Sequence, residues 1–152
     1  MLIEVAIGIA AAPPAVFALL ADIRHWPEWA SQITELTVLT PGPIAVGTCY
    51  RETRTMQGRT VSQEITIQEL QPPVRFVTGA ITHGTRFAGV HRVEPDGVGS
   101  RLVVGFLAQP VTLSAALIHP LMWLMRGRLR RQIERDLADF KRAAEQQPGD
   151  GV

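Results

Sequence analysis

The most constraining feature of this chain is an apolar stripe that runs along its C-terminal part. Apolar residues recur there at three- and four-residue steps: Ile118, Met122, Met125, Leu129, Ile133, Leu137 and Phe140. This spacing is typical of one face of an α-helix and predicts a single long helix from about Leu113 to Glu145. Pro120 lies inside the run and is expected either to kink the helix or to mark its true start. Such a helix must bury its stripe, so the rest of the chain has to supply an apolar partner surface.

The residues that precede this helix supply that surface as a series of strands. Segments of strand-like composition are separated by turn signals, and they cover residues 2–10, 33–40, 48–56, 59–70, 74–79, 84–94 and 100–108. Gln57-Gly58 and Pro95-Asp96-Gly97-Val98-Gly99 are suited to tight turns between neighbouring strands. We therefore predict an α+β fold in which a curved antiparallel sheet of six to seven strands wraps around the C-terminal helix.

Two short helical segments interrupt the strands near the N-terminus. Pro13-Pro14 ends strand pairing and fits the first turn of a short helix, and a second short helical stretch is expected around Arg24 to Ser31. The apolar face of the first helix is supplied by Val16, Phe17, Leu19, Leu20 and Ile23. A curved sheet closed by one long helix and two short ones can enclose a cavity. We expect residues 1–146 to form a single domain and residues 147–152 to form a frayed tail.

Composition and charge argue against several classes of function. Hydrophobic residues make up 46% and charged residues 19% of the 152 residues, as in a globular domain with a buried core. The formal net charge is +1, and we expect no nucleic-acid partner. Cys49 is the only cysteine and no two of the four histidines are spaced i, i+4, so we expect neither a disulfide nor a metal site. Phosphate-loop and dinucleotide fingerprints are lacking as well, and we expect no cofactor.

Two apolar runs of the sequence bear on its cellular location. The N-terminal run carries Glu4 instead of a basic segment and is interrupted by Pro13-Pro14, unlike a signal peptide. The run Leu113–Met125 contains His119 and is shorter than the roughly 20 residues that a membrane-spanning helix needs. We therefore expect a cytoplasmic protein without stable membrane insertion.

Several local motifs are shared with one group of proteins. The most specific is Val16-Phe17-Ala18-Leu19-Leu20-Ala21-Asp22-Ile23 followed by Trp26-Pro27-Glu28-Trp29, and the others are Val46-Gly47-Thr48, Gln71-Pro72-Pro73-Val74-Arg75-Phe76 and Gly99-Ser100-Arg101-Leu102. Over residues 4–145 the chain resembles the START-like (SRPBCC) superfamily, which includes the birch-pollen allergen fold and polyketide cyclase/dehydratase proteins. The resemblance implies a helix-grip fold. It also implies an apolar ligand such as a lipid, sterol or polyketide, but only some members of the superfamily are enzymes.

Strand alternation predicts which side chains face a cavity between sheet and helix. Arg101 is expected to point to water, and this places the alternate residues of its strand inward. The predicted ligand contacts are Leu102, Val104 and Phe106 of that strand, Phe87, Gly89 and His91 of the strand before it, Met122 and Met125 of the long helix, and Trp26, Trp29 and Trp123. Plain core packing is the alternative for the apolar ones, and packing of short helices over the sheet is the alternative for Trp26 and Trp29.

Three polar residues are candidates for acid–base chemistry in the same cavity. An inward His91 imidazole can hydrogen-bond a ligand oxygen or move a proton near neutral pH, and the alternative is a histidine satisfied within the core. Glu52 and Tyr50 share a strand face and would supply a carboxylate and a phenol. Arg54 lies on that face too, so Glu52 would instead pair with it.

Two functions are compatible with these residues. In the first, which the apolar residue set favours, the protein binds or carries a hydrophobic small molecule. In the second, it is a polyketide cyclase/dehydratase-type enzyme that uses His91, Glu52 or Tyr50 as acid–base groups. A cyclase needs polar groups that converge on one substrate carbon, whereas a carrier needs only shape and one or two polar anchors.

A basic cluster begins where the apolar stripe enters its second half. It consists of Arg126, Arg128, Arg130, Arg131 and Arg135. Helical spacing spreads these residues around the helix, which is typical of a solvated face that pairs with Glu134, Asp136 and Asp139. An anionic membrane or an acidic partner is the alternative. The sequence leaves the oligomeric state open.

Overall fold

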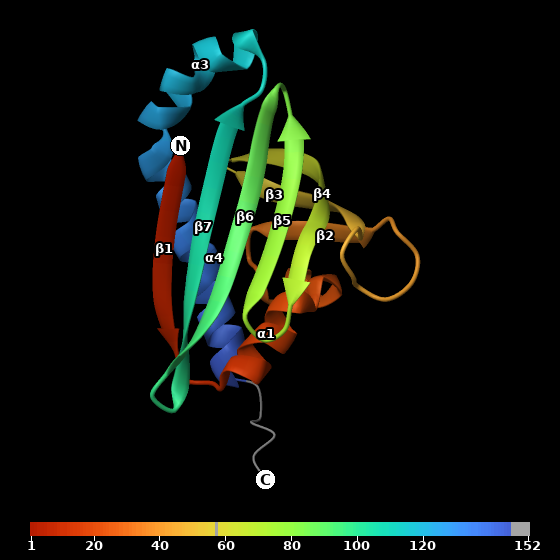
Figure 1. The fold of residues 1–152 in the computed structure, drawn as a ribbon, viewed down its shortest axis with the longest axis vertical. Coiled ribbons are helices and arrows are strands. Elements are labelled where there is room, and N and C mark those ends of the chain that lie inside the picture. Colours follow the sequence, from red (N-terminus) through yellow and green to blue (C-terminus); the bar gives the residue numbers. More distant parts are fainter. Residues whose placement is uncertain (57, 147–152) are drawn as a thin grey trace.

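The computed structural model describes residues 1–56 and 58–146 of the chain. Seven strands form one antiparallel sheet in the order β1-β7-β6-β5-β4-β3-β2 (Figure 1). They are β1 (Leu2–Ile9), β2 (Ile33–Val38), β3 (Cys49–Met56), β4 (Arg59–Gln71), β5 (Arg75–Thr82), β6 (Thr85–Asp96) and β7 (Gly99–Pro110). The order follows the chain except that β1 pairs with β7. This sheet and the long helix that it encloses confirm the predicted helix-grip fold.

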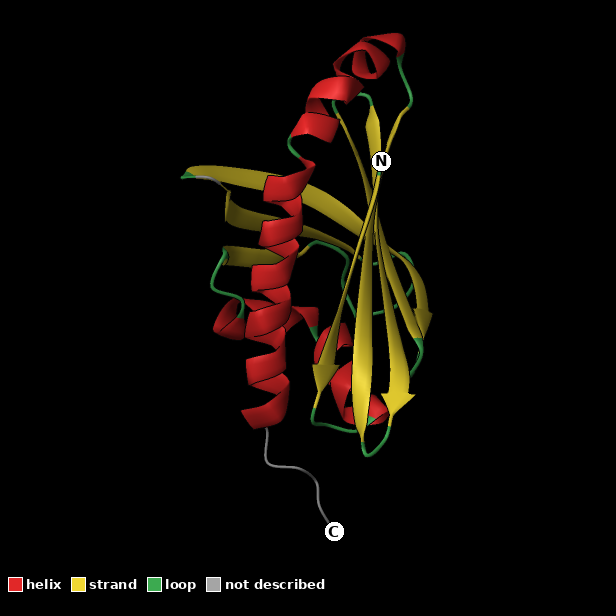
Figure 2. Ribbon diagram, turned by 90° about the vertical axis from the view of Figure 1, so that its left-hand side faces the viewer, coloured by secondary structure: helices red, strands yellow, loops and turns green. Residues whose placement is uncertain are grey.

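The sheet bends so that it surrounds one helix. β6 and β7 pair along their full twelve-residue lengths, and together with β1 and β5 they form a long wall. The register of β4 against β5 shifts between Ile67 and Glu69, and such an irregularity bends and twists a strand. β2, β3 and β4 run across the direction of the long strands and extend past the helix (Figure 2).

Strand boundaries agree closely with the predicted segments, and β5 shows the largest difference. It was expected to end at Gly79 but continues to Thr82, because residues 80–82 keep pairing with β6. The turn that follows has His83 and Gly84 in the left-handed region, with φ values of 49° and 73°. Two consecutive positive φ angles are typical of a tight hairpin turn. Of the turn predicted at Gln57-Gly58, Gln57 lies outside the described residues, as does the tail 147–152.

Three short helical elements follow β1. α1 (Pro13–Ala21) begins with prolines in its first turn, where no hydrogen bond from the backbone nitrogen is needed. η1 (Ile23–His25) and α2 (Trp26–Trp29) continue from it. The indole nitrogen of Trp26 donates to the carbonyl of Leu20 at 3.1 Å, and this bond ties α2 back to α1. α1 lies at the end of the sheet where β6 and β7 are joined by their turn.

The C-terminal helix differs from the prediction, because it is two helices instead of one. α3 (Leu113–Leu124) and α4 (Arg126–Gln146) meet at Met125, and Pro120 lies inside α3 instead of at the break. Only residues 111–112 link β7 to α3, so α3 has to start at the end of that strand. Figure 2 shows that α4 crosses the concave face of the sheet in a different direction from α3. One straight helix could not both start at the end of β7 and follow this path across the sheet. None of the described helices is long and apolar enough to cross a membrane.

One end of the interface between sheet and helix is packed solid. Val16 and Phe17 of α1 are 0% and 3% exposed and lie in the same core cluster as Leu102, Leu137 and Phe140. Trp29 also packs there, with its ring centroid 5.3 Å from that of Phe140. The α1 helix therefore fills the space between α4 and the sheet at this end.

Candidate ligand-binding cavity

The other end of the same interface is hollow. A cavity of about 400 Å³ lies between the sheet and the C-terminal helices, and this volume is within the range of small-molecule sites. Its wall includes side chains from β3, β4, β5, β6 and β7 and from α2, α3 and α4. The lining residues are Trp26, Tyr50, Glu52, Arg54, Met56, Gln63, Ile65, Thr78, Gly79, Ala80, Phe87, Ala88, Gly89, His91, Phe106, Met122, Met125, Leu129, Gln132, Ile133 and Asp136.

Aromatic and thioether side chains make up much of the wall nearest α3. Phe87 of β6 and Phe106 of β7 come from neighbouring strands, and their ring centroids are 5.7 Å apart. Met122 and Met125 face them from the end of α3 and from the residue after it. Methionine side chains adapt to irregular shapes, so this part of the wall suits an apolar ligand without a rigid outline.

Gly89 leaves room at the centre of the β6 wall. A Cβ atom at this position would lie 3.0 Å from the hydroxyl oxygen of Thr78 and 3.4 Å from the Cε1 atom of His91. The first contact is tighter than ordinary van der Waals packing. Any larger side chain at position 89 would therefore displace Thr78 or project into the cavity.

His91 is a neutral group in the wall of the cavity. Its Nδ1 atom lies 3.3 Å from the carbonyl oxygen of Phe76, and the ring packs against the Phe76 ring at a centroid distance of 5.6 Å. A carbonyl accepts only, so Nδ1 carries the proton and Nε2 keeps a lone pair. Burial lowers the pKa of His91 to about 4, so the neutral ring is a hydrogen-bond acceptor for a ligand at physiological pH.

Tyr50 is a poor acid–base group in its present surroundings. Its side chain is 1% exposed and shares a hydrogen bond with Thr78. Burial, together with the nearby Glu52 carboxylate, holds the pKa of the Tyr50 phenol far above its usual value. The phenol therefore stays protonated and serves as a fixed hydrogen-bonding group of the wall.

Glu52 is part of a charged network that closes the floor of the cavity. Arg54 Nε donates to the Glu52 carboxylate at 2.6 Å, and Arg54 Nη1 donates to Asp136 Oδ2 of α4 at 2.9 Å. Burial raises the pKa of Asp136, and the adjacent Arg54 opposes this rise. The predicted alternative, in which Glu52 pairs with Arg54, is the arrangement observed. This network joins β3 to the long helix.

Two polar atoms of α4 are left without a partner beside this network. Gln132 Nε2 and Asp136 Oδ1 are buried and have no hydrogen bond within the part of the chain that the structure describes. Both residues line the cavity and are one helical turn apart. Buried polar atoms are normally satisfied, so this donor and this acceptor are suited to a ligand hydroxyl or carbonyl, or to ordered water.

The structure brings together nine of the thirteen residues predicted from the sequence, counting both ligand contacts and acid–base candidates. They are Trp26, Tyr50, Glu52, Phe87, Gly89, His91, Phe106, Met122 and Met125. The prediction missed Arg54 as the centre of the network, and also Thr78, Gln132 and Asp136. Arg54 shares a strand face with Tyr50, and Gln132 and Asp136 flank the apolar stripe at helical spacing. Which of them contact a ligand stays a prediction.

Four predicted residues do not line the cavity. Leu102 and Val104 face inward as alternation requires, but they are 1% and 8% exposed and belong to the packed core. Trp29 packs on Phe140 instead. Trp123 is 49% exposed on α3, and the Arg126 guanidinium lies 4.0 Å from its ring centroid. Alternation identifies the correct face of a strand, but it does not distinguish the hollow end from the packed end.

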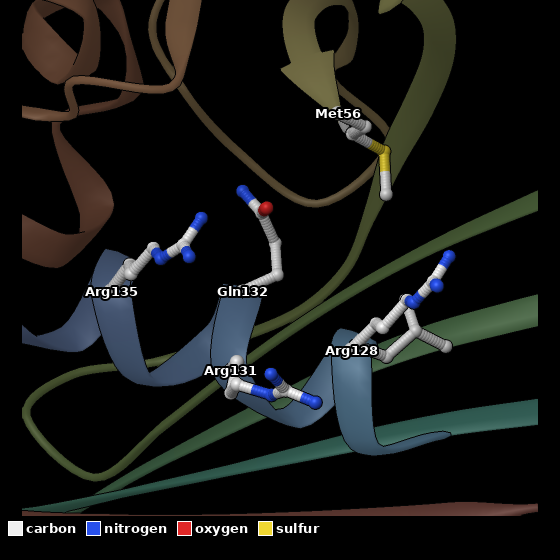
Figure 3. Close-up of a pocket in the computed structure, with 6 residues that line it drawn as sticks. Met56, Arg128, Arg131, Gln132 and Arg135 are labelled. Carbon is white, nitrogen blue, oxygen red and sulfur yellow. The ribbon is translucent and has the colours of Figure 1, made fainter. Parts of the chain in front are cut away.

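A second, polar pocket adjoins the cavity. This arginine groove has a volume of about 120 Å³ and is lined by Met56, Arg128, Leu129, Arg131, Gln132 and Arg135 (Figure 3). Met56, Leu129 and Gln132 line both spaces and form their common rim. The remaining arginines of the basic cluster make surface contacts, such as the Arg130–Glu134 ion pair at 3.2 Å. Within the described residues, no three His, Cys, Asp or Glu gather as metal ligands.

Known proteins share this architecture and part of this sequence. The uncharacterized protein Rv2574 of Mycobacterium tuberculosis is 33% identical over 150 residues, covering 93% of this chain and 86% of that protein. The Zhui aromatase/cyclase of Streptomyces sp. R1128 superposes with a TM-score of 0.79 at 17% identity, covering 100% of this chain and 99% of that one. Major latex-like protein 151 of Panax ginseng gives a TM-score of 0.75 at 10% identity, covering 95% and 97% of the two chains. At these identities the two superpositions show a common fold only.

A family model covers nearly the whole chain. The model described as polyketide cyclase / dehydrase and lipid transport matches residues 2–145. The match spans the sheet, the cavity and the C-terminal helices together. The chain therefore belongs to the polyketide cyclase/dehydrase and lipid transport family of the START-like (SRPBCC) superfamily, as its sequence motifs predicted.

Proposed function

We propose that this protein binds and carries a largely apolar small molecule, of the size of a sterol, fatty acid or aromatic polyketide, in the cavity between sheet and helix. The observation that carries the proposal is the cavity of about 400 Å³ between two surfaces that elsewhere in the same molecule pack solid. Its wall is apolar over most of its area and holds a few convergent polar groups, as small-molecule sites do.

The polar groups of the wall define how such a ligand is oriented. His91 Nε2 accepts a hydrogen bond, while Gln132 Nε2 donates one and Asp136 Oδ1 accepts one. A ligand with an apolar body and one hydroxyl or carbonyl satisfies at least one of these atoms. Satisfying a buried donor or acceptor favours binding by roughly 1 kcal/mol per hydrogen bond.

A thermal-shift screen with apolar ligands tests the proposal. A ligand at about a hundred times its dissociation constant stabilises the folded state by ~2.7 kcal/mol, which for a chain of this size is a rise in Tm of about 5–10 °C. The Ala80→Phe variant fills the cavity and should lose that rise. Val98→Phe adds the same side chain at a fully exposed turn position and should keep it. A broad apolar panel that produces no shift in the native protein would reject the proposal.

A cyclase/dehydratase-type reaction in the same cavity is the second candidate. Its support is that His91, Tyr50 and Glu52 all line one space. In this alternative His91 acts as the base, because its ring is neutral while Tyr50 stays protonated and Glu52 is held by Arg54. His91→Ala should then lower turnover by on the order of a hundredfold or more. If ligands bind but no polyketide-type substrate is consumed, the carrier function remains.

A further inference from the structure

α3 presents an apolar surface that no other part of the described chain covers. Of its residues only Ala115 is buried, and the large exposed side chains are Leu113 (86%), Leu117 (83%), Leu124 (73%), Ile118 (57%), Leu121 (57%) and Trp123 (49%). The helix stands at the end of the molecule opposite α1 (Figure 1). A soluble monomer rarely exposes so many contiguous large apolar side chains without a binding partner for them.

The charges that flank this apolar surface along the chain are positive on its C-terminal side. The sequence contains no aspartate or glutamate between Gly97 and Ile133, whereas the basic cluster begins two residues after α3 ends. The Arg126 guanidinium lies 4.0 Å from the centroid of the Trp123 ring. A cation and an amphipathic aromatic side chain are therefore in contact at the end of α3. Tryptophan beside arginine is typical of side chains at the level of lipid headgroups.

The arginine groove supplies a site for an anion on the first turns of α4, the helix that follows α3. Arg128, Arg131 and Arg135 all line this groove, and Figure 3 shows the Arg128 and Arg135 side chains on the same side of α4 as Gln132. The Arg131 side chain lies along the helix, where its Nε donates to the carbonyl of Gly127 at 3.2 Å. Among the described residues, no carboxylate lines this groove. Guanidinium groups bind phosphate oxygens in pairs, so the groove is suited to one phosphate group.

We propose that α3 and the first turns of α4 form a docking surface for an anionic lipid bilayer. α3 lies in the interfacial layer with its leucines in the acyl region, and the arginine groove takes a lipid phosphate. Twelve residues of helix are about 18 Å long, too short to span a bilayer, so the contact is peripheral. A second copy of the chain is a poorer partner for this surface, because it would bring further arginines and no carboxylates from the same segment.

The position of this surface connects it to the cavity. Met122 of α3 and the adjacent Met125 line the cavity, so a bilayer bound at α3 lies against the cavity wall. An apolar ligand would then move between membrane and cavity with little exposure to water. The docking surface is a property of α3 and the arginines, and it goes beyond the proposed function, which concerns the cavity alone.

Co-sedimentation with lipid vesicles tests the proposal. The native protein should bind vesicles of phosphatidylcholine mixed with phosphatidylglycerol at least tenfold more strongly than vesicles of phosphatidylcholine alone. Binding should fall as salt is added, because the headgroup contribution is electrostatic. No binding to the mixed vesicles at low salt, or equal binding to both kinds, would overturn the proposal.

Matched variants distinguish vesicle binding through this surface from non-specific binding by exposed apolar or charged side chains. Leu117→Ser with Leu121→Ser, and Arg131→Gln with Arg135→Gln, should each reduce binding to mixed vesicles by roughly tenfold or more. Val46→Ser with Val98→Ser, and Arg92→Gln with Arg101→Gln, remove similar side chains from other exposed sites and should leave binding unchanged. Equal losses in the control variants would count against α3 as the docking surface.

Light scattering measures the oligomeric state in solution and so tests whether a second copy of the chain covers α3. A monomer supports the lipid proposal. A stable dimer that becomes monomeric in Leu117→Ser with Leu121→Ser and does not bind mixed vesicles would assign α3 to a second copy. The thermal-shift screen contains no vesicles, so it tests ligand binding in the cavity independently of these results. Failure of the docking proposal would therefore not count against the proposed function.

Discussion

The two ends of the sheet–helix interface contain similar residues, but one end is packed and the other is hollow. At the α1 end, Phe17, Leu102 and Phe140 meet in a packed core with side chains 1–3% exposed. At the α3 end, Phe87, Phe106 and the two methionines surround empty space. Aromatic and aliphatic side chains from the same two long strands contribute to both ends, so composition does not explain the difference.

The difference comes from what is inserted between the two surfaces. α1 enters the interface at one end and brings Val16, Phe17 and Leu20 into contact with the core. At the other end α3 leaves the sheet after the break at Met125, and its large apolar side chains point outward. The cavity therefore exists because α3 does not insert between the sheet and α4. The packed end of the interface supplies the stability that keeps the hollow end folded.

The largest expected effect tests this division directly. Phe140→Ala at the packed end should reduce the free energy of unfolding by about 3–5 kcal/mol, because it leaves a new hole in a filled core. Phe106→Ala at the hollow end should cost only about 1–2 kcal/mol, since Phe106 already borders empty space. Urea titrations of the two variants measure both values. Equal losses would show that the hollow end is packed in solution.

The charged floor of the cavity should be the next most sensitive feature. Arg54→Met leaves the Glu52 and Asp136 carboxylates buried without their partner, and it should cost about 2–4 kcal/mol at neutral pH. Combining it with Glu52→Gln and Asp136→Asn should recover most of that loss. Arg51 lies in the same strand as Arg54, and Arg51→Met breaks an exposed pair with Glu64 of β4, so it should cost less than about 1 kcal/mol. A similar cost for Arg51→Met and Arg54→Met would contradict the role assigned to burial.

Acid should destabilise the hollow end through His91. The pKa of His91 in the folded protein is about 4, below its ordinary value near 6.5, so between these two values the unfolded chain holds a proton that the folded chain lacks. Stability therefore falls as the pH drops from about 6.5 to about 4, by about 3 kcal/mol for this residue, and this contribution levels off below pH 4. His91→Phe should be less sensitive to acid in that window, as measured by denaturation at several pH values. An unchanged slope would mean that His91 is solvated and titrates normally.

The smallest effect is expected on α3. Ile118→Ala removes a side chain that is 57% exposed and should change the free energy of unfolding by no more than about 0.5 kcal/mol. Leu137→Ala lies on the same apolar stripe of the sequence but at the packed end, where Leu137 is 5% exposed, and it should cost about 2–4 kcal/mol. Thermal or urea denaturation distinguishes the two. A large cost for Ile118→Ala would show that α3 packs against the protein in solution.

Much of the fold was determined by the sequence alone, because periodicity is a local property. The switch from strand-like to helical spacing near Pro110 located the sheet and the C-terminal helices, and alternation put Phe87, His91 and Phe106 on the concave face. The motif around Trp26 pointed to the correct family. Each of these inferences needs only neighbouring residues and the geometry of a strand or helix.

Only the tertiary structure decided where the interface is filled and where it is hollow. Val104 and Phe106 lie on one face of β7, yet Val104 is buried in the core and Phe106 lines the cavity, because α1 covers one half of the sheet and not the other. The contact of Arg54 with Asp136, 82 positions later, and the break at Met125 likewise depend on how α4 crosses the sheet. Local spacing sets the face on which a side chain lies. How deeply that side chain is buried, and which residue it contacts, depend on segments far away in the chain. The periodicity of the sequence does not say where those segments lie in space.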